Sequence, residues 1–476
     1  MKKSILKLMS LCCAAALAIT AAGCGTRVEE TSTWIDGEGK TVTITHSGDS
    51  SGGESTIGKN EGRADGGNVK DNGGTSESFD LKGAQVVIAR YTTGDDPNSA
   101  SYQDEQKLIS DIEAKYNCKI VFKDIADSMG YLSAWVTAAQ SGIKFADIVT
   151  LATSWSYPTH MSAGYLTKLD ELLDLNSNIY NKTALEQTAY KGSHYLTVMS
   201  NRLYVEAGIF FNKSIFSKFN QKNPDKYVAE NNWNWNSFLE LAKATTGSKN
   251  GVNYYGFALS GGSAVQQFAK SNGGRSVVYQ DGKYKFNMGS ESYIEGIQFA
   301  YDLVHTHHVT PISLNDSVSM FKSGEVAMLI GSSFNGSSFI EALGSSNVGF
   351  TYIPKGPDVS DYNIRVEETT SYGIPSTVKN PKAIAAIMYD YTYPYKWRPT
   401  LEQQLENHFG DAKSLQTAMD IGIRGNKNLD LKPLYSYISR TVGWSDFGIS
   451  SKTSPQAYIA SITEAAQAEL DQVWEQ

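Results

Sequence analysis

Apolar positions within 84–154 form a pattern that predicts three buried strands separated by two helices. The runs "AQVVIAR", "CKIVFKDI" and "FADIVTLATS" are short, apolar and rich in β-branched residues, which is typical of buried strands. After the first run, Leu108, Ile112 and Tyr116 recur every four residues with Ile109 beside them, which makes one apolar helical face. "YLSAWVTAAQSG" predicts the second helix. Strands and helices that alternate at this spacing predict a parallel sheet with helical crossovers, which is an α/β fold.

The rest of the body continues with strands and helices. "LYVEAGIFFN" and "YYGFALSGG" indicate strands, and "SIFSKFN" and "WNSFLELAKATT" indicate helices. In "SESYIEGIQFAYDLVHTHHV", one helical face carries Ile294, Ile297, Tyr301 and Val304. "SVSMFKSGEVAMLIGSSFNGSSFI" predicts helix, turn, strand, loop and helix. About 400 residues follow Phe79, which is too many for one simple core, so we expect two lobes.

The N-terminal region differs from the body in its pattern. Three lysines precede the charge-free run 8–22, which is shorter than the roughly 20 residues that a membrane-spanning helix needs. A basic start, a short apolar run and small residues at its end predict a signal peptide over 1–23. Residues 24–79 are rich in Gly, Ser, Asp and Asn and bury too little apolar surface to offset chain entropy. We therefore expect this segment to be a disordered tether.

The end of the apolar run carries a second signal. "AAGC", which ends at Cys24, resembles a bacterial lipobox. The resemblance implies cleavage before Cys24 and lipid on its thiol and its new amino group. The body is then held at the outer face of the cell membrane by the lipid anchor, as in a Gram-positive type of bacterium.

Composition narrows the partners and the chemistry. The formal net charge is −8 and the body has no basic run, so nucleic acid finds little to bind. Cys118 is the only cysteine after the lipobox, which excludes a disulfide framework and a CxxC metal pair. The chain has 27 Tyr, 18 Phe and 8 Trp, and aromatic faces pack against the C–H groups of a pyranose ring. Asp, Glu, Asn and Arg side chains suit its hydroxyls.

Five segments of the body resemble, in order, segments of the extracellular solute-binding proteins of ABC importers, the maltose-binding-like group. They are "FADIVTL…GYLTKLDELL", "VEAGIFFNKSIFSKF", "WNWNSFLELAKATT", "MFKSGEVAMLIGSSF" and "YGIPSTVKNPKAIAAI". Phe211 stands where that family usually has Tyr, and "WNWN" lacks the usual Pro and Thr. Together the resemblance covers about 84–393, and beyond Trp397 the chain matches only in being helical.

The resemblance implies a two-lobed periplasmic-binding-protein-like fold, with a mainly parallel sheet flanked by helices in each lobe and three hinge crossings. Lobe one is expected at 84–202 plus 331–376, and lobe two at 203–330 plus 377–476. The ligand would bind in the cleft and close it by population shift. The implied protein is a monomer without cofactor or catalysis, which captures an oligosaccharide and delivers it to the permease subunits of an ABC transporter.

Candidate ligand-binding residues follow predicted strands or lie at the expected crossings. Trp155 and Tyr157 follow the "DIVTL" strand, where the resembled proteins present a sugar-stacking loop. Glu206 lies at the first expected crossing and either binds a ligand hydroxyl or forms an internal salt bridge, since a buried carboxylate needs a partner. The remaining candidates are Tyr91, Thr93, Asp95, Tyr204, Ser260, Ser333, Phe334, Asn335, Glu368, Tyr372 and Trp444. Three other tryptophans are expected in the core: Trp135, Trp233 and Trp235.

The sequence gives weaker support to an enzyme or a metal-binding protein. The paired acids Asp95/Asp96 and Glu367/Glu368 are adjacent, whereas a glycosidase places its carboxyls on opposite sides of one bond. HExxH and GxxxxGK[ST] are absent from the sequence, and GxSxG is absent from the body after residue 79. In "HTHH", His305 and His308 share a helix face, but no acid at matching spacing completes a metal site.

Two alternatives remain open. The same fold can bind a peptide, a polyamine through Glu206, Glu367 and Glu368, or an organic anion through arginines. The arginine candidates are Arg90, Arg202 and Arg365. The protein can also be a ligand receptor for a membrane sensor kinase.

Overall fold

The computed structural model describes part of the chain, in two compact units, Met1–Lys70 and Asp71–Gln476. The described residues are 28–35, 41–48, 79–92, 100–200, 205–259, 262–311, 316–392, 402, 405–431 and 453–474. The predicted signal peptide and the predicted lipidation at Cys24 lie outside them.

The first unit contains a hairpin within the segment that was expected to be a tether. Strands β1 (Val28–Ile35) and β2 (Thr41–Gly48) pair antiparallel, with Trp34 opposite Val42. The expectation of a tether without regular structure over 24–79 is therefore wrong for these strands. Thr, Val and Ile occur in both segments and have a high propensity for β-strands.

Lobe one, within the second unit, is built on a four-stranded sheet in the order β13-β5-β3-β4. Strand β3 runs parallel to β4 and β5, and β13 pairs antiparallel with β5. The strands are β3 (Ala84–Arg90), β4 (Cys118–Asp124), β5 (Ile148–Ala152) and β13 (Thr370–Gly373). The three parallel strands predicted from the apolar runs are thus confirmed.

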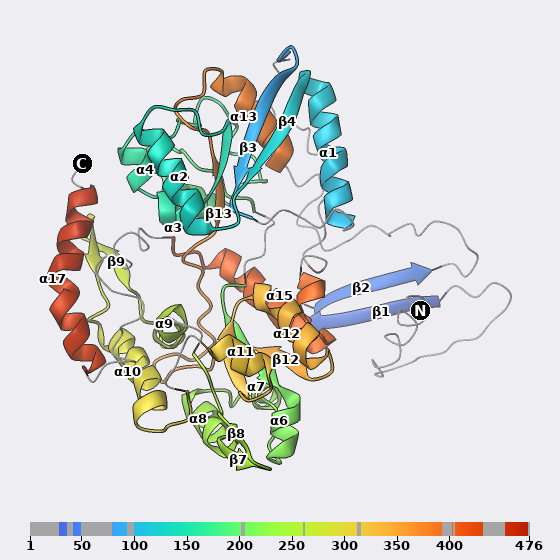
Figure 1. Cartoon of the computed structure of the whole chain (residues 1–476), viewed down its shortest axis with the longest axis vertical. Coiled ribbons are helices and arrows are strands. Elements are labelled where there is room, and N and C mark those ends of the chain that lie inside the picture. The colour runs from blue at the N-terminus through green and yellow to red at the C-terminus, as the bar shows by residue number, and fades with distance from the viewer. Residues whose placement is uncertain are drawn as a thin grey trace. The chain divides into compact units, whose positions relative to one another are not determined.

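Helices flank this sheet (Figure 1). Ile109, Ile112 and Tyr116, on the predicted apolar face of α1, are buried, which confirms that face. Trp135 on α2 is buried as expected, and its indole N–H donates to Nδ1 of His160 at 3.2 Å. The helices of lobe one are α1 (Ala100–Tyr116), α2 (Ser128–Gln140), α3 (Thr153–Ser156), α4 (Thr159–Ser162), α5 (Lys182–Thr188) and α13 (Pro381–Thr392).

Lobe two has a three-stranded sheet in the order β11-β6-β12. The strands are β6 (Gly208–Asn212), β11 (Met328–Gly331) and β12 (Val348–Thr351). Both neighbours run antiparallel to β6, so the expected mainly parallel pairing is not found in this sheet. Because the chain enters lobe two along β6, this strand runs away from the hinge, whereas β11 and β12 run back toward it. Parallel pairing in this lobe includes the bridges Tyr255–Val326 and Ala258–Leu329.

Aromatic side chains fill the core of lobe two. Trp233 and Trp235 are buried there, as predicted, and the Trp235 ring stacks on Phe299 with centroids 4.6 Å apart. Helix α8 begins at a capping box between Asn234 and Ser237. The helices of this lobe are α6 (Lys213–Lys218), α7 (Pro224–Ala229), α8 (Trp235–Ala244), α9 (Gly262–Ser271), α10 (Glu291–His305), α11 (Ser317–Lys322), η1 (Ser333–Asn335), α12 (Gly336–Leu343), η2 (Glu406–His408), α15 (Ala412–Lys427) and α17 (Pro455–Trp474). Its hairpins are β7 (Gly247–Lys249) with β8 (Val252–Tyr254) and β9 (Val277–Gln280) with β10 (Lys283–Phe286).

In the part of the chain that the structure describes, passages between the lobes fall between residues 200 and 205, 351 and 370, and 392 and 405. This corrects two of the expected lobe segments. Segment 331–376 is shared between the sheets, because β12 pairs with β6 while β13 pairs with β5. Helix α13 packs on α1 and shares the core of lobe one, although 377–476 was expected in lobe two. The amphipathic pattern of a segment marks its buried face but not which of two apolar cores covers it.

None of the helices in the described part of the chain is long and apolar enough to cross a membrane.

Candidate functional site

The strand ends of lobe one bring several predicted residues together. Tyr91 follows β3 and Trp155 lies on α3 after β5, and their ring centroids are 4.8 Å apart. The Tyr91 hydroxyl lies 3.3 Å from Oγ1 of Thr370 at the start of β13. Both aromatic rings are half-buried against Tyr131 and the core beneath. The predicted aromatic edge of lobe one therefore exists at the carboxyl ends of β3 and β5.

The hinge carries a buried ion cluster around Lys270 of α9. Its ammonium lies 2.5 Å from Oε1 of Glu206, on the first crossing, and 3.1 Å from Oε2 of Glu367, on the second. Gln267 also donates to Glu206 at 3.1 Å. Burial lowers the pKa of Lys270, but the two carboxylates outweigh it and the pKa is raised, so the ammonium stays charged. Of the two roles left open for Glu206, this geometry shows the internal salt bridge.

Glu368, the neighbour of Glu367, makes a different contact. Its carboxylate accepts a hydrogen bond from the Ser154 hydroxyl of α3. Beside it, the Thr369 amide donates to Oγ1 of Thr153 at 3.0 Å, and the Thr153 amide donates to the Thr369 carbonyl at 2.9 Å. Burial raises the pKa of Glu368, and the hydrogen bond from Ser154 opposes that rise. The second crossing is thus bonded to the turn that follows β5.

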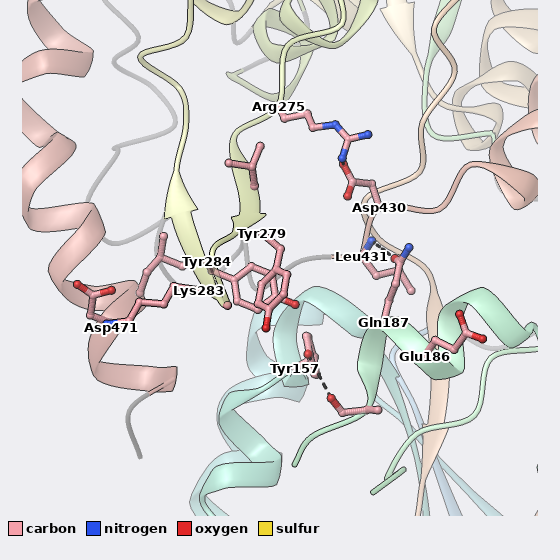
Figure 2. Close-up of a pocket in the computed structure, with 14 residues that line it drawn as sticks. Tyr157, Glu186, Gln187, Arg275, Tyr279, Lys283, Tyr284, Asp430, Leu431 and Asp471 are labelled. Carbon is pink, nitrogen blue, oxygen red and sulfur yellow. Dashed lines mark hydrogen bonds and ion pairs between the residues drawn. The ribbon is translucent and has the colours of Figure 1, made fainter. Parts of the chain in front are cut away.

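A cavity of about 860 Å³ lies between α3–α5 of lobe one and the β9–β10 hairpin of lobe two. Small-molecule sites commonly occupy about 300–1,000 Å³. Figure 2 shows its lining, in which three tyrosines gather opposite a group of charged and amide side chains. The lining residues are Tyr157, Glu186, Gln187, Ala189, Arg275, Val278, Tyr279, Gly282, Lys283, Tyr284, Asp430, Leu431, Leu470 and Asp471.

The three tyrosines differ in exposure. Tyr157, directly after α3, is only 4% exposed, and its hydroxyl donates to the Ala189 carbonyl at 3.4 Å. Burial and the neighbouring Tyr284 hydroxyl raise the pKa of Tyr157, so it remains a neutral phenol. The rings of Tyr279 and Tyr284 lie 4.9 Å apart across the hairpin, and Tyr279 is 63% exposed. Tyr279 therefore presents the most accessible aromatic face of the cavity.

The polar wall joins the cavity to the hinge. Oδ2 of Asp430 lies 3.6 Å from Nη1 of Arg275, which lines the cavity. The same oxygen lies 3.5 Å from Nε of Arg365, which is buried on the second crossing. Gln187 of α5 uses both ends of its amide on the neighbouring backbone. It donates to the Leu429 carbonyl at 2.8 Å and accepts from the Leu431 amide at 2.7 Å. Lobe one is thus bonded to the segment that follows α15.

The other predicted residues lie in different environments. Tyr372, on β13, is 5% exposed and packs in the core of lobe one, where Tyr391 is its ring neighbour at 6.4 Å. Ser333 is buried at the end of β11, and Asn335 accepts from the Ser332 amide as part of a cap. Phe334 between them is 70% exposed. These residues do not line the cavity. Five further candidates lie outside the described residues: Thr93, Asp95, Tyr204, Ser260 and Trp444.

Among the predicted ligand-binding residues that the structure describes, Tyr157 alone lines the cavity, and the aromatic pair on the hairpin was missed. The signal was present in "VVYQDGKYKF", where Asp281–Gly282 between two β-rich runs is a hairpin signal. Tyr279 and Tyr284 sit opposite each other on the paired strands. Arg275 and Asp430 carry no comparable signal, because 155 positions separate them in the sequence.

No group of three His, Cys, Asp or Glu side chains within the described residues is placed to hold a metal ion. The "HTHH" segment ends α10, where the His305 ring packs on Tyr301 with centroids 4.2 Å apart. The Nδ1 of His308 lies 3.1 Å from the Val304 carbonyl.

The two-lobed fold, its crossings and the inter-lobe cavity can now be compared with known proteins. The sequence model of the family described as "Bacterial extracellular solute-binding protein" matches residues 96–388. The chain belongs to this family. Proteins of this family bind solutes outside the cell.

Solved structures agree on the fold at low sequence identity. The GacH receptor of Streptomyces glaucescens, solved unliganded and with acarbose, is 18% identical, with a TM-score of 0.58, and the match covers 82% of this chain and 99% of that one. Maltose-bound MalE3 of T. maritima is 16% identical, with a TM-score of 0.59 and coverage of 81% and 100%. The Listeria monocytogenes protein Lmo0181, solved with cycloalternan, is 15% identical, with a TM-score of 0.56 and coverage of 83% and 99%. The resemblance to the maltose-binding-like group is thereby confirmed at the level of the fold.

Proposed function

We propose that this chain is a lipid-anchored substrate-binding protein that captures an oligosaccharide and delivers it to an ABC transporter permease. The observation that carries the proposal is the cavity between the lobes, at which Tyr279 and Tyr284 of lobe two meet Tyr157 of lobe one (Figure 2). Aromatic faces pack on the C–H patches of sugar rings, and the amide and charged groups of the opposite wall suit hydroxyls. Binding and release need no chemistry, so no catalytic residue is assigned.

The acidic side chains at the hinge are already paired within the protein, which favours a neutral ligand over a cationic one. The acids that were candidates for a polyamine have partners within the protein, because Glu206 and Glu367 pair with Lys270, and Glu368 accepts from Ser154. A cationic ligand would have to displace these contacts.

Two of the three arginine candidates also have partners within the protein, and Arg202 lies outside the described residues. Arg90 pairs with Glu105 at 3.1 Å and Asp124 at 2.8 Å, and Arg365 donates to the Gly274 carbonyl at 3.0 Å. An organic anion would have to compete with these internal acceptors. A polyhydroxylated neutral ligand needs neither displacement at the hinge. The cavity itself is lined by side chains of both charges, Glu186 and Asp471 as well as Arg275 and Lys283, which suits a neutral polar ligand.

The solved relatives bind sugars of several kinds, as their names state: acarbose, maltose and cycloalternan. This range supports an oligosaccharide as the ligand class and leaves the particular sugar to experiment.

The ligand class is tested by thermal unfolding of the chain from residue 25 against a panel of linear and cyclic oligosaccharides, with polyamines and short peptides alongside. A sugar at about 100 times its Kd adds about 2.7 kcal/mol to the free energy of unfolding and raises the melting temperature. We expect a rise with one glycan series. A rise with a polyamine or a peptide and a flat response to every sugar would overturn the ligand class while leaving the fold unchanged.

The anchor is tested by Cys24→Ser in the full chain. We expect release into the medium or an unprocessed precursor, since the thiol that takes the lipid is gone. Unchanged retention at the membrane would contradict the lipidation of Cys24. Delivery to a permease, as opposed to signalling through a sensor kinase, is tested by uptake of the labelled sugar in cells that lack the protein.

A further inference from the structure

The second crossing carries two adjacent carboxylates whose partners belong to different lobes. Glu367 binds Lys270 on α9 of lobe two, and Glu368 binds Ser154 on α3 of lobe one. Consecutive side chains of an extended chain point to opposite sides, which is how one short segment reaches both lobes. The strand β13 follows directly, so the segment enters the sheet of lobe one at Thr370.

The contact on the lobe-two side is closed and ionic. Lys270 lies between Glu367 and Glu206, and the Glu367 amide also donates to Oε2 of Glu206 at 3.4 Å. Lys270 is only 6% exposed. Removing one partner from a buried set of charges is strongly destabilising, so this side holds the segment firmly.

The contact on the lobe-one side stabilises helix α3, which is too short to be stable by its own hydrogen bonds. Helix α3 has four residues, and its first turn has no side-chain cap of its own. A helix this short gains too few internal hydrogen bonds to offset the cost of ordering its backbone. Its position depends on contacts such as those to the second crossing: Ser154 to Glu368, and Thr153 to Thr369 in both directions. The charged groups that act on Glu368 electrostatically are Glu206 and Lys270.

The turn that these contacts hold carries a cavity residue. The Tyr157 amide donates to the Thr153 carbonyl at 2.9 Å, which closes α3 and places the Tyr157 ring beside Tyr284 at the cavity. A shift of α3 would therefore move Tyr157 relative to the β9–β10 hairpin of the other lobe.

We propose that Glu368 is a positioning residue for ligand binding, which fixes α3 through Ser154 and thereby holds Tyr157 at the cavity, while Glu367 fixes the same segment to lobe two. The inference rests on the proposed function, because it takes the cavity as the ligand site. Glu368 acts through Ser154 and makes no ligand contact itself.

The first arm of the test needs no ligand. Amide hydrogen exchange is measured on peptides that span 150–158 in the unliganded chain from residue 25, for Glu368→Ala, Ser154→Ala and Glu368→Gln. We expect faster exchange in both alanine variants and nearly unchanged exchange in Glu368→Gln, since the amide oxygen still accepts from Ser154. The matched control is Ser156→Ala, whose hydroxyl donates within its own turn to the Ala152 carbonyl at 3.2 Å. Exchange as in the unsubstituted protein for Glu368→Ala would overturn the inference.

The second arm measures the affinity for maltotetraose by titration calorimetry. We expect Glu368→Ala and Ser154→Ala each to weaken binding about three- to tenfold, as the loss of one hydrogen bond implies, and the double variant to equal the single ones. Glu368→Gln should restore affinity to within about twofold. Additive losses, or no rescue by glutamine, would overturn the inference. If the unsubstituted protein binds neither maltotetraose nor any sugar of the panel, the proposed function fails, and the exchange arm decides on the positioning role by itself.

Discussion

The hinge and the cavity both contain polar side chains, but those of the hinge are largely buried and paired with one another, whereas some of those in the cavity are exposed. At the hinge, Glu206, Glu367 and Lys270 are largely buried and satisfy one another. In the cavity, Tyr279 is 63% exposed, and Lys283 is exposed as well. Groups that are paired inside the protein hold two lobes in a defined relation, whereas groups left accessible can bind a ligand. A polar residue at a crossing is therefore not by itself a ligand-binding residue.

The largest effect is expected at the hinge. Lys270→Met leaves Glu206 and Glu367 without their cation and should lower the free energy of unfolding by about 3–5 kcal/mol. Urea denaturation measures it. Lys285→Met is the matched control, because that lysine pairs at the surface with Asp281 at 2.7 Å and should change stability by less than about 1 kcal/mol. Equal effects of the two substitutions would remove the contrast between hinge and surface.

His160 is buried without an ionic partner among the described residues, unlike the paired charges at the hinge, and its protonation should make stability depend on pH. Burial lowers the pKa of His160, on helix α4, from 6.5 to about 4. As the pH falls from about 6.5 toward 4, the unfolded chain takes up a proton that the folded protein does not, so stability is lost in this window by about 3 kcal/mol. Denaturation at about pH 7 and about pH 4.5 measures the loss. His160→Gln, whose amide oxygen can accept from Trp135, should show a smaller loss, and an unchanged pH slope would contradict the assignment.

In the cavity the effect is expected on affinity and not on stability. Tyr279→Ala removes an exposed aromatic face and should weaken sugar binding about fivefold, since one such stacking contact is worth on the order of 1 kcal/mol. Calorimetry measures the affinity and thermal unfolding the stability. Ile143→Ala is the control, because Ile143 is also 63% exposed but does not line the cavity. A loss of stability without a loss of affinity would place Tyr279 in the framework of the hairpin.

The smallest effect is expected at the aromatic edge of lobe one. Trp155 does not line the cavity and part of its ring is already covered by Tyr91, so Trp155→Ala should weaken sugar binding by at most about two- to fivefold, with little change in the melting temperature of the unliganded protein. Unchanged affinity with a large drop in melting temperature would make Trp155 a core residue.

Local patterns predicted most of the elements but not their pairing. The face of α1 and strands β3, β4 and β5 were correct, because burial imposes a period on the sequence that needs no knowledge of the partner. The assignment of α13 was wrong, because an apolar face fits either core. The pairing of β6 with β11 and β12 depends on the direction in which the chain crosses the hinge, and a single sequence does not encode this direction locally.

The candidate site shows the same division. Tyr157 was found because it follows a recognisable strand, and Tyr91 and Trp155 lie at the predicted strand ends. Glu206 was left between two roles, and only the position of Lys270 on another helix decided between them. Tyr372 was predicted beside the ligand and lies in the core, since alternate residues of a strand face opposite sides and the register is set by the neighbouring strand.

By itself, the sequence determined the alternation of strands and helices, the aromatic composition and the resemblance to solute-binding proteins, because these depend on residues close together in the chain. Only the tertiary structure decided which carboxylates are paired, which tyrosines meet at the cavity and which lobe each helix joins. Arg275 and Asp430, or Ser154 and Glu368, come together across long stretches of chain, and their contacts exist only once both lobes have folded.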